Sequence, residues 1–488
     1  MNNIGTFRTE MGNSYIYDGT TDVILPGEDN LIEMIDSTEV FDRDLIYKYA
    51  NDNLKSLMKT WNLFNTDDLP VITINKYSFV PMPQLILGIT ERCNLRCKYC
   101  IFSGNYDDMR THNNNKMSDE IAIKALDYYF DHLNANKEYF PIQLPAITFY
   151  GGEPLLEFDL IKKVVKHAKG LDCVFNLTTN GTLLNQETIE YLVDNNFIIG
   201  ISLDGPKKIH DKNRVFPDNS GSFDNVINNF KNLKSYIKKV GKTDRQMLVI
   251  LSCYEDDTDL SSVNDFFSNS DLGFNNNDLV FNTILHRCTL IKEKKNHIKK
   301  PNKSFTELSK IYLQGISTGE YDKSQFLFLN QIFGSSLRSI LVRFVNPYGN
   351  SAHRALGGSC IPGKKLFVSS DGRFHICERI NANFSIGDYI KGFDFELINQ
   401  IVERWSQSIA YYCHSCPYIS LCGICYANCA EGNDFNIKKN CNKVGIENRL
   451  KTVFSILEKA PHAFDDTSED KNLTNDNYEQ YISMMKGC

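Results

Sequence analysis

Between residues 83 and 285 the hydrophobic positions form short apolar runs that are separated by longer amphipathic stretches. The apolar runs are rich in β-branched and aromatic residues, as strands covered on both faces are. The amphipathic stretches carry helix signals, such as an N-cap serine at Ser118 and a terminating glycine at Gly170. Strands are predicted at 85–89, 146–150, 173–178, 198–203, 247–253 and 279–285. Six strand–helix repeats predict an α/β fold whose parallel sheet is open or curled into a partial (β/α)6, TIM-like barrel.

The remaining chain divides around these repeats, which we assign to residues 81–290. Residues 1–80 predict a small α+β, winged-helix-like unit. Its expected elements are a hairpin of strands 14–17 and 23–25 turning at Gly19, helical patterns such as that over 45–61, and a strand near 71–74. After the repeats we expect a bridging region (291–350), a cysteine-rich domain (351–450) and a C-terminal helix with a polar tail (451–488).

Composition narrows the class of protein. With 42% hydrophobic and 23% charged residues, the 488-residue chain is of ordinary globular type. The net charge, 53 − 60 = −7, argues against nucleic acid as a partner. No apolar run approaches the roughly 18 residues that a membrane span needs, and the first residues contain no signal-peptide stretch. We therefore expect a cytoplasmic protein without a membrane partner.

Fifteen cysteines change this picture. A cytoplasmic chain keeps its thiols reduced, so dense cysteines there indicate metal binding or catalysis. Three of them, Cys93, Cys97 and Cys100, follow the first predicted strand directly, and eight more lie within 360–441. Four others stand alone and are expected to be inert: Cys173, Cys253, Cys288 and Cys488.

The first group has the spacing C-x3-C-x2-C. Three thiolates are one short of the four that closed zinc or iron–sulfur sites use, so one metal position is left open for a ligand. The loop leaves the carboxyl end of a strand, where α/β barrels build their active sites. The alternative is a zinc loop that His112 completes.

Further motifs follow the next predicted strands. Gly151-Gly152-Glu153-Pro154 ends the second, Thr179-Asn180-Gly181 the third, and Ser202-Leu203-Asp204-Gly205-Pro206 the fourth, with Arg214 shortly after. Together with the cysteine loop, whose aromatic position is Tyr99, this order resembles the radical S-adenosylmethionine (SAM) superfamily. The resemblance implies that Cys93, Cys97 and Cys100 hold a [4Fe–4S] cluster that SAM chelates. It also implies a SAM site formed by Tyr99, Gly151, Gly152, Glu153, Asn180, Ser202, Asp204 and Arg214.

Three of these residues have expected partners on SAM. By the resemblance, Tyr99 lies against the adenine, Glu153 suits the ammonium and Arg214 the carboxylate.

The second cysteine group begins with Cys360, which eleven residues, Gly372 and four further residues separate from Cys377. It continues as Cys413-x2-Cys416-x5-Cys422-x2-Cys425-x3-Cys429 and ends at Cys441. Eight thiolates suffice for two four-cysteine sites, of zinc or of iron and sulfur. The array is similar to the SPASM domain of radical SAM enzymes that modify peptides. That similarity implies two auxiliary [4Fe–4S] clusters, and so three clusters in all.

The similarity also implies how the second group divides. Cys413, Cys416, Cys422 and Cys441 are expected to hold the second auxiliary cluster. The first auxiliary cluster is expected to be held by Cys360 and Cys377, together with Cys425, Cys429 or both. The spacing after Cys422 departs from the family pattern, and it leaves open whether this first auxiliary cluster has a free iron.

The resemblance implies an oxidoreductase that abstracts hydrogen from a ribosomally made precursor peptide through a 5′-deoxyadenosyl radical and installs an oxidative crosslink, preferably a thioether. Its expected partners are the precursor, whose leader the N-terminal unit would capture by strand addition, and a low-potential electron donor such as flavodoxin or ferredoxin.

Two alternatives remain. One is an anaerobic sulfatase maturase that forms formylglycine, and the other is a zinc-binding scaffold. Sulfatase maturases usually begin near the cysteine loop and place an aspartate where this chain has Glu378, the candidate catalytic residue. The N-terminal extension and Glu378 therefore favour the crosslinking enzyme.

Overall fold

The computed structural model describes residues 3–38, 43–65, 69–74, 82–106, 109–138, 144–243, 247–255, 257–269, 271–274, 279–283, 303–319, 329–349, 354–357, 362 and 365–464. Across these residues, no helix combines the length and apolarity that a membrane crossing requires.

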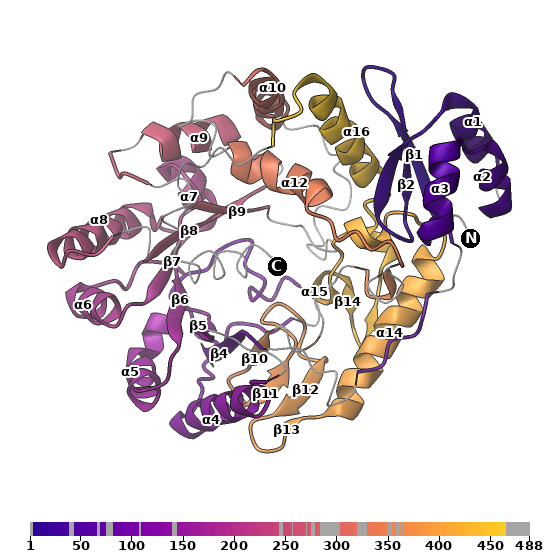
Figure 1. Cartoon of the computed structure of the whole chain (residues 1–488). Coiled ribbons are helices and arrows are strands. Elements are labelled where there is room, and N and C mark those ends of the chain that lie inside the picture. Colours follow the sequence, from indigo (N-terminus) through magenta and orange to yellow (C-terminus); the bar gives the residue numbers. More distant parts are fainter. Residues whose placement is uncertain are drawn as a thin grey trace.

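Six parallel strands form the centre of the molecule, as the sequence predicts. They lie along an arc in Figure 1, with the connecting helices on its outer side. The strands are β4 (Gln84–Thr90), β5 (Ala146–Gly151), β6 (Val174–Thr179), β7 (Ile198–Ser202), β8 (Leu248–Tyr254) and β9 (Leu279–Thr283). The helices are α4 (Asp119–Ala135), α5 (Phe158–His167), α6 (Gln186–Asp194), α7 (Lys207–Asn213), α8 (Phe223–Lys239), α9 (Leu260–Asn269) and α10 (Lys303–Thr318). The α/β fold with a central parallel sheet is confirmed.

The sheet does not stop at β4. Strand β10 (Leu366–Val368) pairs with β4 in parallel, and three antiparallel strands extend the sheet beyond it. These are β11 (Arg373–His375), β12 (Ser385–Asp388) and β13 (Gly392–Phe393). The β10–β4 pairing brings the start of the second cysteine region to the edge of the barrel.

The rest of the C-terminal half is mostly helical. After α12 (Ser335–Leu341), it contains α14 (Phe395–Cys413), α15 (Tyr426–Cys429), the hairpin β14 (Ala430–Glu431) and β15 (Asp434–Phe435), and α16 (Lys443–Lys459). One continuous cluster of buried hydrophobic residues runs through both the barrel and this half. The described chain ends shortly after α16, and the expected polar tail, from residue 465, lies outside the described residues.

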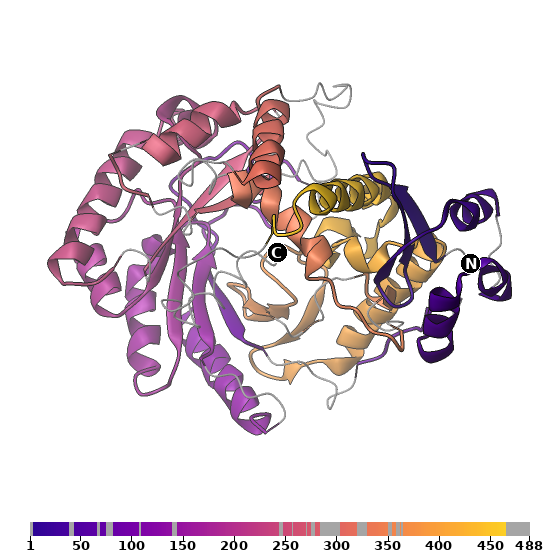
Figure 2. The ribbon, with the colours of Figure 1, turned by 45° about the horizontal axis from the view of Figure 1, so that its top comes forward.

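The described residues of the N-terminal unit form three antiparallel strands and three helices, with a hydrophobic core of their own. They are β1 (Ile4–Arg8), β2 (Ser14–Asp18), β3 (Val23–Pro26), α1 (Asp29–Ser37), α2 (Arg43–Tyr49) and α3 (Asp52–Thr60). The predicted hairpin is confirmed as β2–β3, whereas β1 was not expected. Figure 2 shows this unit beside the C-terminal half, where β1 lies against α16.

The helical pattern over 45–61 is confirmed, but it forms the two helices α2 and α3, because the Asn51 side chain accepts a hydrogen bond from the Leu54 amide and starts a new helix. One prediction in the N-terminal unit is wrong. The strand expected near 71–74 does not form. There the amides of Ile72 and Ile74 donate to Ser406 and Asn399 of α14 instead of to a neighbouring strand.

Candidate active site at the mouth of the barrel

A cavity of about 340 Å³ opens where the parallel strands end. One wall carries the three loop cysteines and most of the predicted SAM residues, and the other comes from the residue before β10 and from the segment after β11. The barrel wall includes Cys93, Cys97, Tyr99, Cys100, Gly151, Gly152, Asn180, Ser202 and Arg214. The C-terminal wall contributes Lys365, Glu378 and Arg379. The structure thus brings together residues that lie almost 300 positions apart.

The three loop thiols are largely buried close to one another. Burial, together with the charges of Glu153, Cys97 and Cys100, raises the pKa of Cys93 to about 12. Burial likewise raises the pKa of Cys100 to about 11. Thiolates rather than thiols bind metals, and thiolates packed this closely repel one another unless a positive metal centre offsets their charge. The loop therefore fits a metal cluster.

Hydrogen bonds hold the cysteine loop from two sides. On one side the amides of Gly152 and Glu153 donate to the carbonyls of Thr90 and Arg92, at 2.9 and 2.8 Å. On the other, the amide of Arg96 donates to the Val215 carbonyl at 2.7 Å. A Cβ atom at position 152 would collide with the Arg92 carbonyl. The glycine pair thus permits close approach to the cysteine loop, in addition to lining the cavity.

Glu153 points into the protein. Its carboxylate is fully buried and accepts hydrogen bonds from the Leu155 amide (3.1 Å), the Thr179 hydroxyl (2.8 Å) and the Asn180 amide (2.8 Å). Burial raises its pKa to about 7, against these hydrogen bonds. Glu153 therefore fixes the Thr179–Asn180 turn, and its contact with the SAM ammonium stays a prediction.

Asp204 and Arg214 form a buried ion pair behind the cavity. Arg214 Nε lies 3.0 Å from Asp204 Oδ2, and the Tyr99 hydroxyl donates to the same oxygen at 2.7 Å. The other oxygen, Asp204 Oδ1, accepts from the Cys253 amide at 3.0 Å. The Arg214 guanidinium also lies over the Tyr99 ring, 5.3 Å from its centre. This network fixes Tyr99 and Arg214 in the wall where the sequence places SAM.

Two cavity residues were missed or undervalued from the sequence. Cys253, expected to be inert, lines the cavity at the end of β8, and burial raises its pKa to about 12. Arg379 was not singled out, although it directly follows the candidate Glu378. Its position next to a predicted cluster ligand, Cys377, was the available signal.

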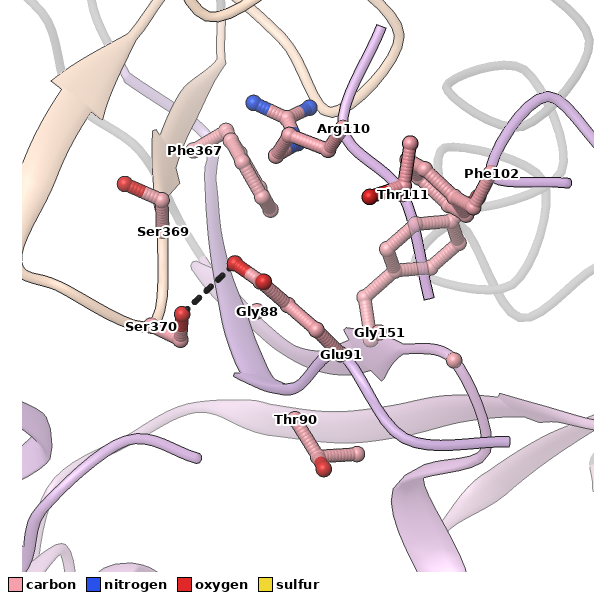
Figure 3. Close-up of a pocket in the computed structure, with 12 residues that line it drawn as sticks. Gly88, Thr90, Glu91, Phe102, Arg110, Thr111, Gly151, Phe367, Ser369 and Ser370 are labelled. Atoms are coloured by element: carbon pink, nitrogen blue, oxygen red, sulfur yellow. Dashed lines mark hydrogen bonds between the residues drawn. The ribbon is translucent and has the colours of Figure 1, made fainter. Parts of the chain in front are cut away.

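A smaller pocket lies beside the cavity, along the seam between β4 and β10 (Figure 3). There the Ser370 hydroxyl donates to the Glu91 carboxylate at 2.7 Å, and Arg110 lies over the ring of Phe367. Arg110 also donates to the backbone carbonyl of Glu378. These contacts fix the C-terminal wall against the barrel.

Several thiols of the second cysteine group lie near one another, and their division between two clusters stays a prediction. Burial raises the pKa of Cys413 to about 12, and the charges of Cys416, Cys422 and Cys441 add to the effect. Burial raises the pKa of Cys377 to about 12 as well, with Glu378 and Cys425 among the neighbouring charges. Cys429 is buried one helical turn after Cys425, to whose carbonyl its amide donates at 3.2 Å. Cys360 lies outside the described residues.

The His112 alternative also has a structural basis. His112 Nε2 lies 3.6 Å from Cys100 Sγ, so this side chain could approach a metal bound to the loop. Its ring also contacts the Glu91 carbonyl at 3.3 Å. The geometry of the loop is thus compatible with zinc as well as with an iron–sulfur cluster. The proteins to which the chain is similar distinguish the two.

Residues 87–250 match the model of the radical SAM superfamily. The chain is 24% identical over 370 residues to the cysteine-type anaerobic sulfatase-maturating enzyme of Clostridium novyi (strain NT), a match that covers 74% of this chain and 91% of the relative. It is 31% identical over 161 residues to the serine-type anaerobic sulfatase-maturating enzyme of Bacteroides thetaiotaomicron, covering 32% of this chain and 37% of the relative.

A solved structure of native anSMEcpe with bound AdoMet and Cp18Cys peptide has a similar fold. Its TM-score is 0.54 at 22% identity, and the match covers 79% of this chain and 98% of that one. The chain therefore carries a radical SAM domain homologous to that of the anaerobic sulfatase-maturating enzymes, and its cysteine-rich C-terminal region fits a SPASM-type domain. This family implies a [4Fe–4S] cluster and SAM.

Proposed function

We propose that this protein is a radical SAM maturase of a ribosomally made precursor peptide, in which it installs an oxidative crosslink with a thioether as the preferred bond. The observation that carries the proposal is the two-walled cavity. Its barrel wall holds the cysteine loop and the predicted SAM residues, while its C-terminal wall adjoins the cysteines assigned to the first auxiliary cluster. A peptide segment between the walls would lie between the radical source and an electron acceptor.

We assign the cofactors as three clusters and one SAM. Cys93, Cys97 and Cys100 would hold the first cluster, and the two C-terminal sets would hold the auxiliary pair. When bound, this cluster and SAM supply the radical that removes hydrogen from the substrate. Tyr99, Asn180, Ser202 and Arg214 line the place where SAM would bind.

Glu378 would accept a proton from the peptide. Forming a thioether from a C–H and an S–H bond releases two hydrogens, one as an atom and one as a proton, and leaves one electron for an acceptor. Glu378 lines the cavity, and its Oε2 atom is buried without a hydrogen-bond partner in the described structure. A carboxylate in that condition is a good candidate for the proton acceptor.

The N-terminal unit would capture the leader. Its sheet has the order β1-β2-β3, and β1 lies against α16, so β3 is the edge that remains for an added strand. Hydrogen–deuterium exchange of the intact enzyme with a leader peptide should show new protection at β3 (Val23–Pro26). Protection confined to the barrel would contradict this role.

The specific alternative is formation of formylglycine, which the match over 91% of the Clostridium novyi enzyme favours. Coexpression with short peptides encoded beside the gene, followed by mass spectrometry, separates the two. A crosslinked peptide loses a pair of hydrogens, keeps its sulfur and has a thiol that no longer alkylates. A cysteine converted to formylglycine loses its sulfur and gains a hydrazide-reactive aldehyde. The Cys93→Ala variant is the control for both.

A further inference from the structure

The N-terminal unit packs against the segments that carry the predicted ligands of the second auxiliary cluster. Its strand β1 lies against α16, the helix that begins two residues after Cys441 (Figure 2). The Glu10 amide donates to the Ser455 hydroxyl at 3.0 Å, and the Glu10 carboxylate is ion-paired to Lys459 at 2.9 Å. The helix that follows one predicted ligand is therefore fixed on the N-terminal unit.

A closer contact is made by Tyr418, whose ring fills a slot in the sheet of this unit. Gly5 of β1 and Tyr17 of β2 are register partners. The centre of the Tyr418 ring is 5.3 Å from that of Tyr17, and both rings are almost fully buried. A Cβ atom at position 5 would overlap the Tyr418 ring. The ring therefore occupies the space that the glycine leaves beside Tyr17.

A second glycine holds the residue before Tyr418. Gly19, in the turn between β2 and β3, lies so close to the Pro417 carbonyl that a Cβ atom there would overlap it. The Gly19 amide donates to the Asn3 carbonyl at 2.7 Å, which fixes this turn at the start of β1. Pro417 and Tyr418 directly follow Cys416. Two neighbouring positions after a predicted ligand are thus seated on the N-terminal unit.

The contact reaches the ligand sulfur through the backbone. The amide of Tyr418 donates a hydrogen bond to the Cys416 sulfur. The charges of the other three predicted ligands act on Cys413, so the four thiols lie close enough to fit one cluster. Hydrogen bonds to ligand sulfurs favour the reduced form of an iron–sulfur cluster, because reduction adds negative charge. The position of Tyr418 therefore bears on the redox properties of this site.

We propose that the N-terminal unit seats the Cys416–Tyr418 segment, and that Tyr418 is a positioning residue for the second auxiliary cluster. By holding the Tyr418 amide against the Cys416 sulfur, the unit raises the reduction potential of the cluster that Cys416 would ligate. The inference rests on the cofactor assignment of the proposed function, and it gives the N-terminal unit a role beside leader capture. It is independent of the type of bond that the enzyme forms.

Redox titration of the anaerobically reconstituted full-length enzyme, monitored by electron paramagnetic resonance, tests the proposal without a substrate. The resonance that Cys416→Ala loses is assigned to the second auxiliary cluster. Gly5→Ala and Gly19→Ala should each lower the equilibrium constant for reducing that cluster about tenfold, or about 59 mV for one electron, because the hydrogen bond is weakened. Loss of that resonance together with about four irons is the stronger form of the same result. The potentials of the other two clusters should stay unchanged.

Gly27→Ala is the matched control. A Cβ atom there would press on Ile16 and Ile32, so this variant crowds the unit's own core rather than the Cys416–Tyr418 segment. Its cluster potentials should equal those of the wild type. The double variant Gly5→Ala with Tyr418→Leu should rescue the potential, because the shorter side chain relieves the overlap and the backbone amide is kept. It also keeps the test open if Gly5→Ala alone loses iron.

Three results would overturn the proposal. The first is an unchanged potential of the second auxiliary cluster in both Gly5→Ala and Gly19→Ala. The second is an equal shift in Gly27→Ala, since the effect would then come from the stability of the unit. The third is a Cys416→Ala protein that keeps all of its resonances, since Cys416 would then hold no cluster. Failure of the proposed function is a separate result, namely a peptide product without a crosslink.

Discussion

The two walls of the cavity differ in how their acidic side chains are bound. On the barrel wall every acidic group discussed above is paired, with Asp204 bound to Arg214 and Tyr99, and Glu153 bound by three donors. On the C-terminal wall, Glu378 Oε2 has no hydrogen-bond partner in the described structure, and the charges of Glu378, Cys425 and Cys377 act on Arg379. A wall with its charges fixed in advance suits one constant ligand. A wall with a carboxylate oxygen left without a partner suits a group that takes a proton from the ligand.

The largest effect should come from removing the cysteine loop. The triple variant Cys93→Ala, Cys97→Ala and Cys100→Ala should abolish reductive SAM cleavage while the auxiliary clusters stay, because none of their predicted cysteines belongs to the loop after β4. Anaerobic assays of 5′-deoxyadenosine under dithionite measure this. Continued cleavage by the triple variant would show that the SAM-binding cluster is held elsewhere.

A second large effect should be on the unfolding free energy, and it should differ between substitutions in the two walls. Asp204→Ala leaves the buried Arg214 charge without its partner, which should cost roughly 3–5 kcal/mol of unfolding free energy. Glu378→Ala removes no ion pair among the described residues and should cost much less. Thermal unfolding of both variants under anaerobic conditions makes the comparison, and equal losses would mean that the walls do not differ in this respect.

SAM affinity should depend more on Arg214 than on Glu153. Arg214→Gln should weaken binding roughly 10- to 150-fold, the usual effect of losing a charge-assisted hydrogen bond. Glu153→Gln should have a smaller effect, because its carboxylate reaches the cavity only through the Thr179–Asn180 turn. Equilibrium dialysis with labelled SAM measures both affinities. If neither changes, the assignment of the strand-end motifs is shifted.

The smallest effect concerns acid stability. His210 is buried, with one ring nitrogen 3.4 Å from the Asp204 amide and the other 3.0 Å from the Ser222 hydroxyl. Burial lowers its pKa to about 3, whereas in the unfolded chain the pKa is near 6.5. The folded state then binds fewer protons, so this contribution to stability is present above about pH 6.5 and is lost as the pH falls toward 3.

His210→Gln should therefore flatten the fall of the unfolding midpoint between these pH values. Burial also lowers the pKa of His375 to about 3. Because His375 is unchanged in the variant, its part of the acid sensitivity should remain. An unchanged pH profile would show that His210 does not contribute to the acid sensitivity.

Much of the barrel could be predicted from the sequence, because a strand buried on both faces is a readable apolar run. The order of motifs at the strand ends also placed Tyr99, Asn180, Ser202 and Arg214 in one wall. The failed strand near 71–74 shows the limit, since its amides bond to side chains of α14 that lie more than 300 residues away. No local pattern signals such a partner.

The direction of a side chain could not be predicted either. The GGEP motif identified Glu153, but only the fold shows that its carboxylate faces the protein interior. Arg379 passed unnoticed because its place in the cavity depends on the pairing of β10 with β4. Such a property belongs to the assembled cavity rather than to the residue.

Metal and sulfide analysis of the anaerobically purified wild-type protein, together with its visible absorption spectrum, tests the central claim most directly. The account predicts a brown protein with about twelve irons per chain and a matching amount of sulfide, as three four-iron clusters require. A colourless protein that contains zinc would contradict it.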